Sequence, residues 1–223
     1  MSAATGVGVR RQQEQEMIGA LLHSLSQPLT TLCCSLELSM EKTAGQQHEV
    51  VATALEQAER VIALVRLLRE YLDAELTQPA ARPVMFMPVL RAAADQLSAV
   101  AAVRQTGVRL VGDCLARVPL PEERLKLALQ YLIGGMIDTQ PARSQVTLKV
   151  QNSTTESILR ALAKPTLPAS ETPRDCVQAI LRQARLAIAC RLLESAGIIV
   201  EISEYGLPAG FLLRLPHPSS RPV

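Results

Sequence analysis

The fold of this chain is decided by the stretch from His23 to Thr30, which reads His-Ser-Leu-Ser-Gln-Pro-Leu-Thr and lies inside a long amphipathic pattern. Apolar residues within this stretch and on both sides of it recur at steps of four and three, at Ile18, Leu22, Leu25, Leu29, Leu32 and Leu36. This heptad spacing predicts a helix of a coiled coil or helical bundle over residues 14–42. The helix therefore carries a histidine beside its apolar stripe and a proline five residues later.

A second heptad stripe follows after a short connection at residues 43–48. Its members are Val51, Leu55, Ala58, Ile62, Val65, Leu68 and Leu72. Two helices of similar length joined by a short loop form an antiparallel hairpin. A lone hairpin leaves its apolar stripe exposed, and a second copy would bury it, so the pattern predicts a homodimeric four-helix bundle. The alternative is an intramolecular bundle with later helices of the same chain.

Beyond a linker with two prolines at residues 78–83, helical patterns alternate with short strand patterns. Helices are expected at 88–103, 121–137 and 174–196, and strands at 84–87, 108–111, 116–120, 145–151, 157–163, 198–203 and 210–215, although 157–163 also fits a short helix. This alternation predicts an α+β fold, in which the helical hairpin is followed by an α/β sandwich. The expected division is a disordered N-terminus at 1–13, the hairpin at 14–77, the sandwich at 84–217 and a tail at 218–223.

Composition narrows the class of protein. The formal net charge of +2 is too small to favour nucleic acid or an anionic membrane as a partner. No apolar run approaches the ~20 residues that span a bilayer, and the N-terminus lacks the apolar core of a signal peptide, so a cytoplasmic location is expected.

Five cysteines without CxxC spacing argue against a disulfide framework and against a zinc site. Cys33 and Cys34 are expected to be small residues in or near the core, and the three scattered histidines predict no metal site.

A hairpin carrying His-x-x-x-Gln-Pro-Leu, followed by an α/β domain, resembles the core of histidine kinases over about residues 14–217. Such kinases usually read His-Glu-Leu-x-(Thr or Gln)-Pro-Leu at this place, and this chain keeps all but the acid, which is replaced by Ser24. Residues 125–137 are similar to the kinase Asn-box helix, and residues 184–197 look like the helix after the last glycine box. The closing strands, 200–202 and 211–216, fit the family as well. The resemblance implies that His23 is a phosphoryl acceptor.

The residues that hold ATP in this family are absent. The two asparagines of the Asn box fall on Tyr131 and Gly135, and in the family the second of them coordinates the magnesium of ATP. No Asp-x-Gly-x-Gly box occurs between Gln151 and Asp175, and the last glycine box reads Gln-Ala-Arg-Leu at 183–186. Side chains there replace the glycines that let phosphates approach the backbone. This implies a degenerate ATP site without autokinase activity, as in the dimeric histidine phosphotransferases of bacterial phosphorelays, which the chain resembles.

The phosphotransferase resemblance implies a role for several residues of the first helix. The neutral imidazole of His23 has a lone pair that can attack an aspartyl phosphate. Gln27 lies one turn later on the same face, where it orients the imidazole or a water, or is simply solvated. Ser26 and Thr30 share this face and are candidate contacts for a receiver domain. Pro28 removes the backbone hydrogen bond to the Ser24 carbonyl and should bend the helix.

The partners implied are a second copy of the chain and the receiver domains of response regulators, with a hybrid histidine kinase as a further candidate. The receiver would supply the Mg²⁺, so no cofactor is expected in this chain. Two alternatives remain open. One is a non-catalytic pseudo-histidine-kinase that sequesters or scaffolds a kinase or response regulator, and the other is an active kinase with a divergent nucleotide pocket.

Overall fold

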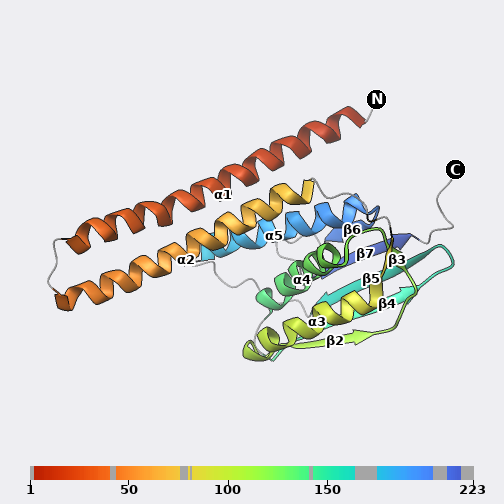
Figure 1. The fold of residues 1–223 in the computed structure, drawn as a ribbon. Coiled ribbons are helices and arrows are strands. Elements are labelled where there is room, and N and C mark those ends of the chain that lie inside the picture. Colours follow the sequence, from red (N-terminus) through yellow and green to blue (C-terminus); the bar gives the residue numbers. More distant parts are fainter. Residues whose placement is uncertain are drawn as a thin grey trace. The chain divides into compact units, whose positions relative to one another are not determined.

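The computed structural model describes residues 3–40, 44–75, 80, 82–140, 143–163, 175–202 and 210–216. Within the helices, only the backbone is described for 3–17, 38–40, 44–49, 75 and 175–178. The chain divides into two compact units (Figure 1). The first extends to Leu72 and includes the first half of the last helix, up to Ala184, and the second begins at Asp73.

The first unit contains the predicted helical hairpin. Its helices are α1 (Ala3–Met40), which has Pro28 in its interior, and α2 (Ala44–Glu75). Here α1 begins well before residue 14, so the helix takes in most of the segment for which disorder was expected, where Arg, Gln and Glu at 10–16 are good helix formers. The expected connection at 43–48 is shorter, because α2 already begins at Ala44.

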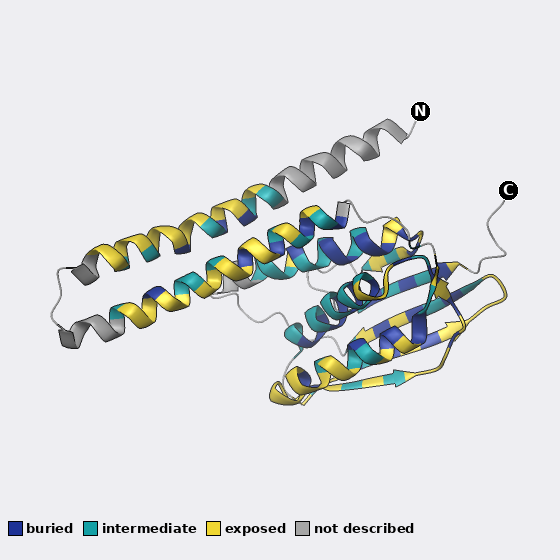
Figure 2. Cartoon of the chain, viewed as in Figure 1, coloured by how far each residue is buried: buried dark blue, intermediate teal, exposed yellow. Residues whose placement is uncertain are grey.

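The hairpin buries a different stripe from the one marked by the heptads. Leu21, Ser24 and Pro28 are the buried residues of α1, and α2 buries Ala54 and Leu64 among others. The large apolar residues left exposed are Leu22, Leu29 and Leu36 of α1 and Val51, Leu55, Ile62, Val65 and Leu72 of α2. Figure 2 shows this as alternating buried and exposed positions along both helices. These eight residues, called here the open stripe, all belong to the predicted heptads.

The second unit is an α/β sandwich with a mixed five-stranded sheet in the order β2-β4-β5-β7-β6. Strand β2 runs parallel to β4, and every other neighbouring pair is antiparallel. Its strands are β2 (Gly107–Val111), β4 (Gln145–Asn152), β5 (Glu156–Ala163), β6 (Ile199–Ile202) and β7 (Gly210–Pro216). A separate two-stranded sheet pairs β1 (Val84–Met85) with β3 (Arg117–Val118).

Helices α3 (Phe86–Val103), α4 (Glu122–Thr139) and the second half of α5 (Asp175–Ser195) cover one face of the sheet. The strands alternate accordingly, so that Leu148 and Leu159 are buried while Lys149 and Arg160 are exposed. The same alternation explains why 157–163 is a strand and not a helix. Helix α5 ends in a Schellman motif at Gly197 (φ 76°), where the Ile198 N–H donates to the Leu193 carbonyl at 3.0 Å. The fold class predicted from the sequence is thus confirmed.

Helix α3 is, among the described helices, the one that by length and composition is apolar enough to cross a membrane. It packs against α4 and β2 and buries one face, including Phe86, Leu90 and Ala93, in the core of the sandwich. An amphipathic helix with such a buried face is a core helix of the α/β unit.

Candidate functional site

His23 lies on the exposed surface of α1, one residue after Leu22 of the open stripe. Gln27, one turn later, is exposed on the same face. In the single chain, His23 is therefore exposed to solvent beside Leu22, which is itself exposed. An exposed imidazole with a polar amide one turn away can accept and return a small electrophilic group.

Three hydroxyl groups around His23 donate hydrogen bonds back to their own helix. Ser26 Oγ donates to the Leu22 carbonyl at 3.0 Å, and Thr30 Oγ1 to the Ser26 carbonyl at 3.0 Å. Thr31, which sequence reasoning did not single out, donates to the Gln27 carbonyl at 3.1 Å. Since these protons are used within the helix, Ser26 and Thr30 offer a partner lone pairs and not donors.

Ser24 and Pro28 lie on the buried side of α1. Pro28 has no N–H, so the carbonyl of Ser24 lacks its usual helical donor. Ser24 stands where the kinases that this chain resembles carry an acid, and it is only 3% exposed. The position that would hold a general base beside the histidine is therefore occupied by a buried hydroxyl, which cannot act as a base at neutral pH.

The cysteines of α1 were expected in or near the core, and this prediction is wrong, because Cys33 and Cys34 are both exposed. The face that α1 buries is that of Leu21 and Pro28, and the two cysteines fall outside it. Cys34 follows His23 by about three helical turns and so shares its face. By contrast, burial, with a contribution from the charge of Glu194, raises the pKa of the Cys190 thiol to about 11, which keeps it protonated and unreactive near neutral pH.

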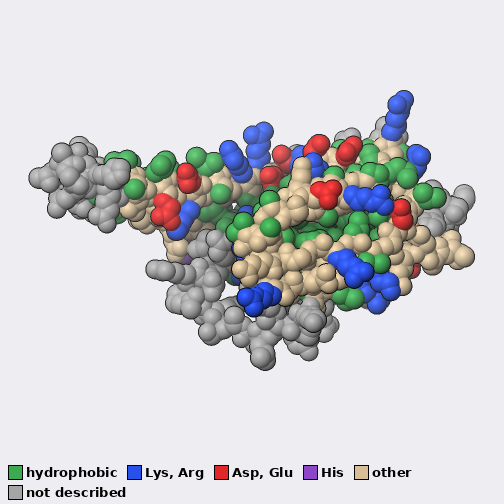
Figure 3. Space-filling model, turned by 90° about the horizontal axis from the view of Figure 1, so that it is seen from below, with side chains coloured by type: hydrophobic (Ala, Val, Ile, Leu, Met, Phe, Trp, Pro, Cys, Tyr) green, Lys and Arg blue, Asp and Glu red, His purple; other side chains and the backbone are tan. Residues whose placement is uncertain are grey.

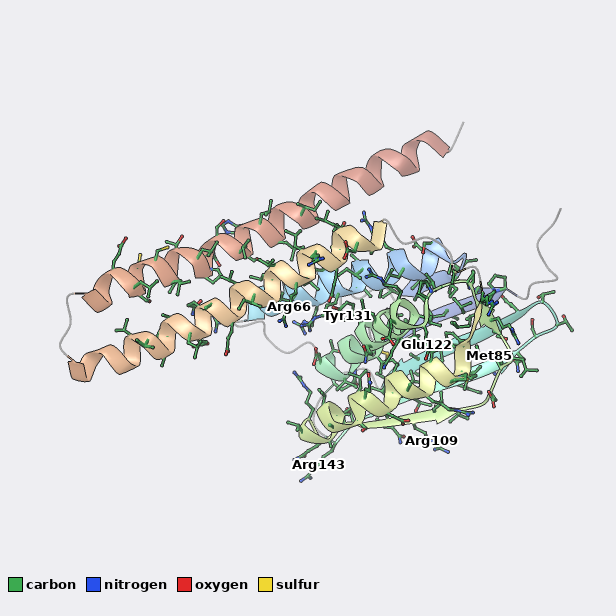
Figure 4. All side chains as sticks on the ribbon, viewed as in Figure 1. Arg66, Met85, Arg109, Glu122, Tyr131 and Arg143 are labelled. Carbon is green, nitrogen blue, oxygen red and sulfur yellow. The ribbon has the colours of Figure 1, made fainter. Side chains whose placement is uncertain are left out.

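The second unit brings together two of the positions assigned to a degenerate nucleotide site. Tyr131, labelled in Figure 4, lies on α4, and Arg185 lies on α5. The Arg185 guanidinium carbon is 6.0 Å from the centre of the Tyr131 ring, at the outer limit of a cation–π contact. Gly135, one turn after Tyr131, has no side chain to coordinate a metal. Two large side chains thus contact each other where the resemblance places an asparagine and a glycine.

The fold has relatives among solved structures, whereas no protein-family model and no curated protein matches the sequence. The histidine kinase AdeS of Acinetobacter baumannii superposes with a TM-score of 0.64 at 17% identity, over 88% of this chain and 98% of that one. The histidine kinase ThkA, in complex with the response regulator TrrA, gives 0.62 at 13% identity over 99% of this chain and 69% of that one. Full-length ShkA in complex with AMPPNP gives 0.56 at 17% identity, over 92% of this chain and 45% of that one.

The chain has a histidine-kinase-like fold. The stretch where an Asp-x-Gly-x-Gly box would be sought contains strand β5, which the structure describes, followed by residues 164–174. Residues 164–174 lie outside the described part of the chain. Among the residues that the structure describes, no group of three His, Cys, Asp or Glu side chains is placed to hold a metal ion.

Proposed function

We propose that this chain is a cytoplasmic histidine phosphotransferase of a bacterial phosphorelay, which carries a phosphoryl group between receiver-domain aspartates on His23. The observation that carries the proposal is the exposed His23, followed by Gln-Pro-Leu, on the hairpin of a histidine-kinase-like fold. In the same chain, a Tyr131–Arg185 contact stands where a kinase would hold nucleotide. A histidine suited to receive phosphate is thus combined with a domain unsuited to supply it.

The proposed transfer is a displacement at phosphorus. The lone pair of the neutral His23 imidazole forms an N–P bond while the bond from phosphorus to the aspartate oxygen breaks, and the carboxylate leaves with that electron pair. The phosphohistidine then transfers its phosphoryl group to a second carboxylate by the reverse step, in which the N–P bond breaks and its electron pair returns to the imidazole. The other ring nitrogen keeps its proton throughout. Charge on the phosphoryl oxygens is balanced by the Mg²⁺ that the receiver brings. Gln27 is placed to orient the imidazole, with Ser26 and Thr30 accepting hydrogen bonds from the receiver.

A receiver domain as partner is supported by the ThkA structure, in which a kinase of this fold is bound to a response regulator. A hybrid histidine kinase, which carries its own receiver domain, would fit the same surface of α1.

The open stripe supports a second copy of the chain as a further partner. Its eight residues are each about half exposed, and together they offer on the order of 700 Å² of apolar surface per protomer. This is close to the ~800 Å² per partner of a standard interface. Large apolar side chains left exposed in this number on one hairpin are unusual for a monomer. Two hairpins that pair through it form a four-helix bundle with His23 at the edge of the interface.

The proposal excludes autokinase activity. ShkA, which shares the fold, was crystallised with the nucleotide analogue AMPPNP. In this chain, Gly135 cannot coordinate magnesium, and the Tyr131–Arg185 pair occupies the positions of the missing asparagine and glycine. Ser24, buried beside His23, supplies no base.

The test is transfer of labelled phosphate from phosphorylated receiver domains to the full chain. The wild type is expected to acquire an acid-labile, base-stable label, which His23→Ala loses while Glu37→Ala, an exposed change on the same helix, keeps it. Receiver binding without label would favour the scaffolding pseudo-kinase. Label acquired directly from Mg²⁺-ATP would instead identify an active kinase.

A further inference from the structure

The sheet of the second unit has one face that the helices leave open. Alternate residues of every strand point to this face, and most of them are exposed. Its charged members are Arg109, Lys149, Glu156, Arg160, Glu201 and Arg214. In Figure 4, Arg109 projects from β2 on the side away from α3. Four cations therefore share the face with two carboxylates.

Both carboxylates are used by one arginine. Arg214 donates from Nη1 to Glu156 at 3.1 Å and from Nε to Glu201 at 2.9 Å. None of the other three cations, Arg109, Lys149 and Arg160, forms an ion pair with a residue that the structure describes. Among the residues that the structure describes, these three positive charges thus have no ion-pair partner.

These three cations are close together in the sheet register. Lys149 of β4 is directly opposite Arg160 of β5, and Arg109 lies two residues before Val111, the β2 partner of Lys149. Like charges directly opposite each other in antiparallel strands destabilise the sheet. An acidic residue in place of either Lys149 or Arg160 would therefore make the free protein more stable.

Apolar side chains flank the cations. One cross-strand row reads Val111, Lys149, Arg160, Leu212 and Glu201, and Leu162 lies two residues after Arg160 on the same face. Val111 and Leu162 are exposed, and Leu212 is partly exposed. The three cations and these three apolar residues are called here the basic sheet face. Figure 3 shows more generally that Lys and Arg side chains lie beside apolar ones on one side of the molecule.

We propose that the basic sheet face binds an acidic segment of a partner protein, with carboxylates on the three cations and apolar side chains against Val111 and Leu162. Charge complementarity selects this occupant, because Arg and carboxylate form strong, directional pairs. The described residues of the face include no aromatic side chain on which nucleobases could stack. Since Arg214 is paired with two carboxylates, only three cations are available to a ligand, which is fewer than the 4–8 that typify membrane-recruiting clusters. This inference does not depend on phosphate transfer through His23.

The test measures binding of a fluorescent peptide, in which Asp and Glu alternate with Leu and Ala, by anisotropy with the full chain. Lys149→Glu is expected to weaken binding about tenfold or more, since it replaces an attraction by a repulsion. Arg117→Glu, the matched control on β3, makes the same kind of charge change at an exposed arginine outside the face and should leave affinity nearly unchanged. Binding should weaken as salt is raised.

A second readout separates a binding role from a structural one. Because Lys149→Glu turns a like-charge pair with Arg160 into an opposite-charge pair, it should raise the melting temperature by about 1 to 3 °C while binding is lost. The proposal is overturned if Lys149→Glu binds the acidic peptide as well as wild type, or if Arg117→Glu loses binding equally. It is also overturned if the chain binds a DNA oligonucleotide or phosphatidylserine vesicles but not the acidic peptide.

Discussion

Replacing Leu29 by Ala is expected to weaken self-association of the chain about 30-fold. Leu29 lies in the middle of the open stripe and is 40% exposed in the single chain. Full burial of a leucine is worth roughly 2–3 kcal/mol, so burying the remaining fraction contributes about 1 kcal/mol. A two-fold interface contains two copies of Leu29, so its loss costs about 2 kcal/mol per dimer, or about 30-fold in Kd.

Leu29→Glu should have a larger effect, because it would place two unpaired carboxylates in an apolar bundle core, and we expect a monomer. The assay is sedimentation equilibrium over a wide concentration range, with far-UV circular dichroism to confirm that the helices persist. Val103, at the end of α3, is 86% exposed and lies outside the open stripe, so Val103→Ala and Val103→Glu are the matched controls. A wild type that stays monomeric at all concentrations, or a Leu29→Ala variant that associates like Val103→Ala, would refute the reasoning.

Three other predictions concern the second unit. Gly112→Ala should lower the free energy of unfolding, measured in urea, by about 2–4 kcal/mol, because the φ of Gly112 is +90° and a Cβ would lie 2.2 Å from the Val150 carbonyl oxygen. In the control variant Gly107→Ala, the added Cβ would have no atom nearer than 3.9 Å, and the loss of free energy should be less than half as large. Burial raises the pKa of Cys190 from 9.0 to about 11, so the free energy of unfolding should fall by up to about 2 kcal/mol as pH rises from 9 to 11, where the thiol ionises in the unfolded chain first. Cys190→Ala should reduce this dependence of the unfolding free energy on pH. Titration with a fluorescent ATP analogue and Mg²⁺ should show no saturable binding. Saturation at micromolar concentration would instead favour the hypothesis of an active kinase with a divergent nucleotide pocket.

The sequence predicted the elements of this fold well because its periodicities are strong. The heptads marked both helices of the hairpin, and alternation in β4 and β7 marked strands whose inner residues are buried. What periodicity did not provide was the face that one helix turns to the other. Leu22 and Leu29 of the heptad stripe are exposed, as expected for a lone hairpin, but no heptad marks Leu21 and Pro28 as the positions that are buried in the single chain. A helix in a bundle has an apolar stripe wide enough for two contacts, and the heptad marks the stripe without dividing it between partners.

The candidate site was predictable where it depends on a local motif. His23 and Gln27 share an exposed face because they are one turn apart, which sequence spacing fixes. The contact of Arg185 with Tyr131 depends on how α5 packs beside α4, and no local pattern contains that information. The back-bonding of Ser26 and Thr30 was also missed, since a hydroxyl in a helix can point either to the i−4 carbonyl or to a partner.

Under the proposed function, in which the chain has no working nucleotide site, the exposed His23 has a consequence for the direction of signalling. His23 would gain phosphate only from a partner and lose it only to another partner or to water. No step in this chain would consume ATP, so mass action among the receivers would set both direction and extent of transfer. A buried Ser24 in place of a base fits this arrangement, because an aspartyl phosphate already has a good leaving group and a neutral imidazole needs no proton removed before it attacks. The acid that kinases place beside the histidine would then be dispensable in this chain. Ser24→Ala, which removes the hydroxyl and fits the buried position, should leave transfer from a phosphorylated receiver largely unchanged.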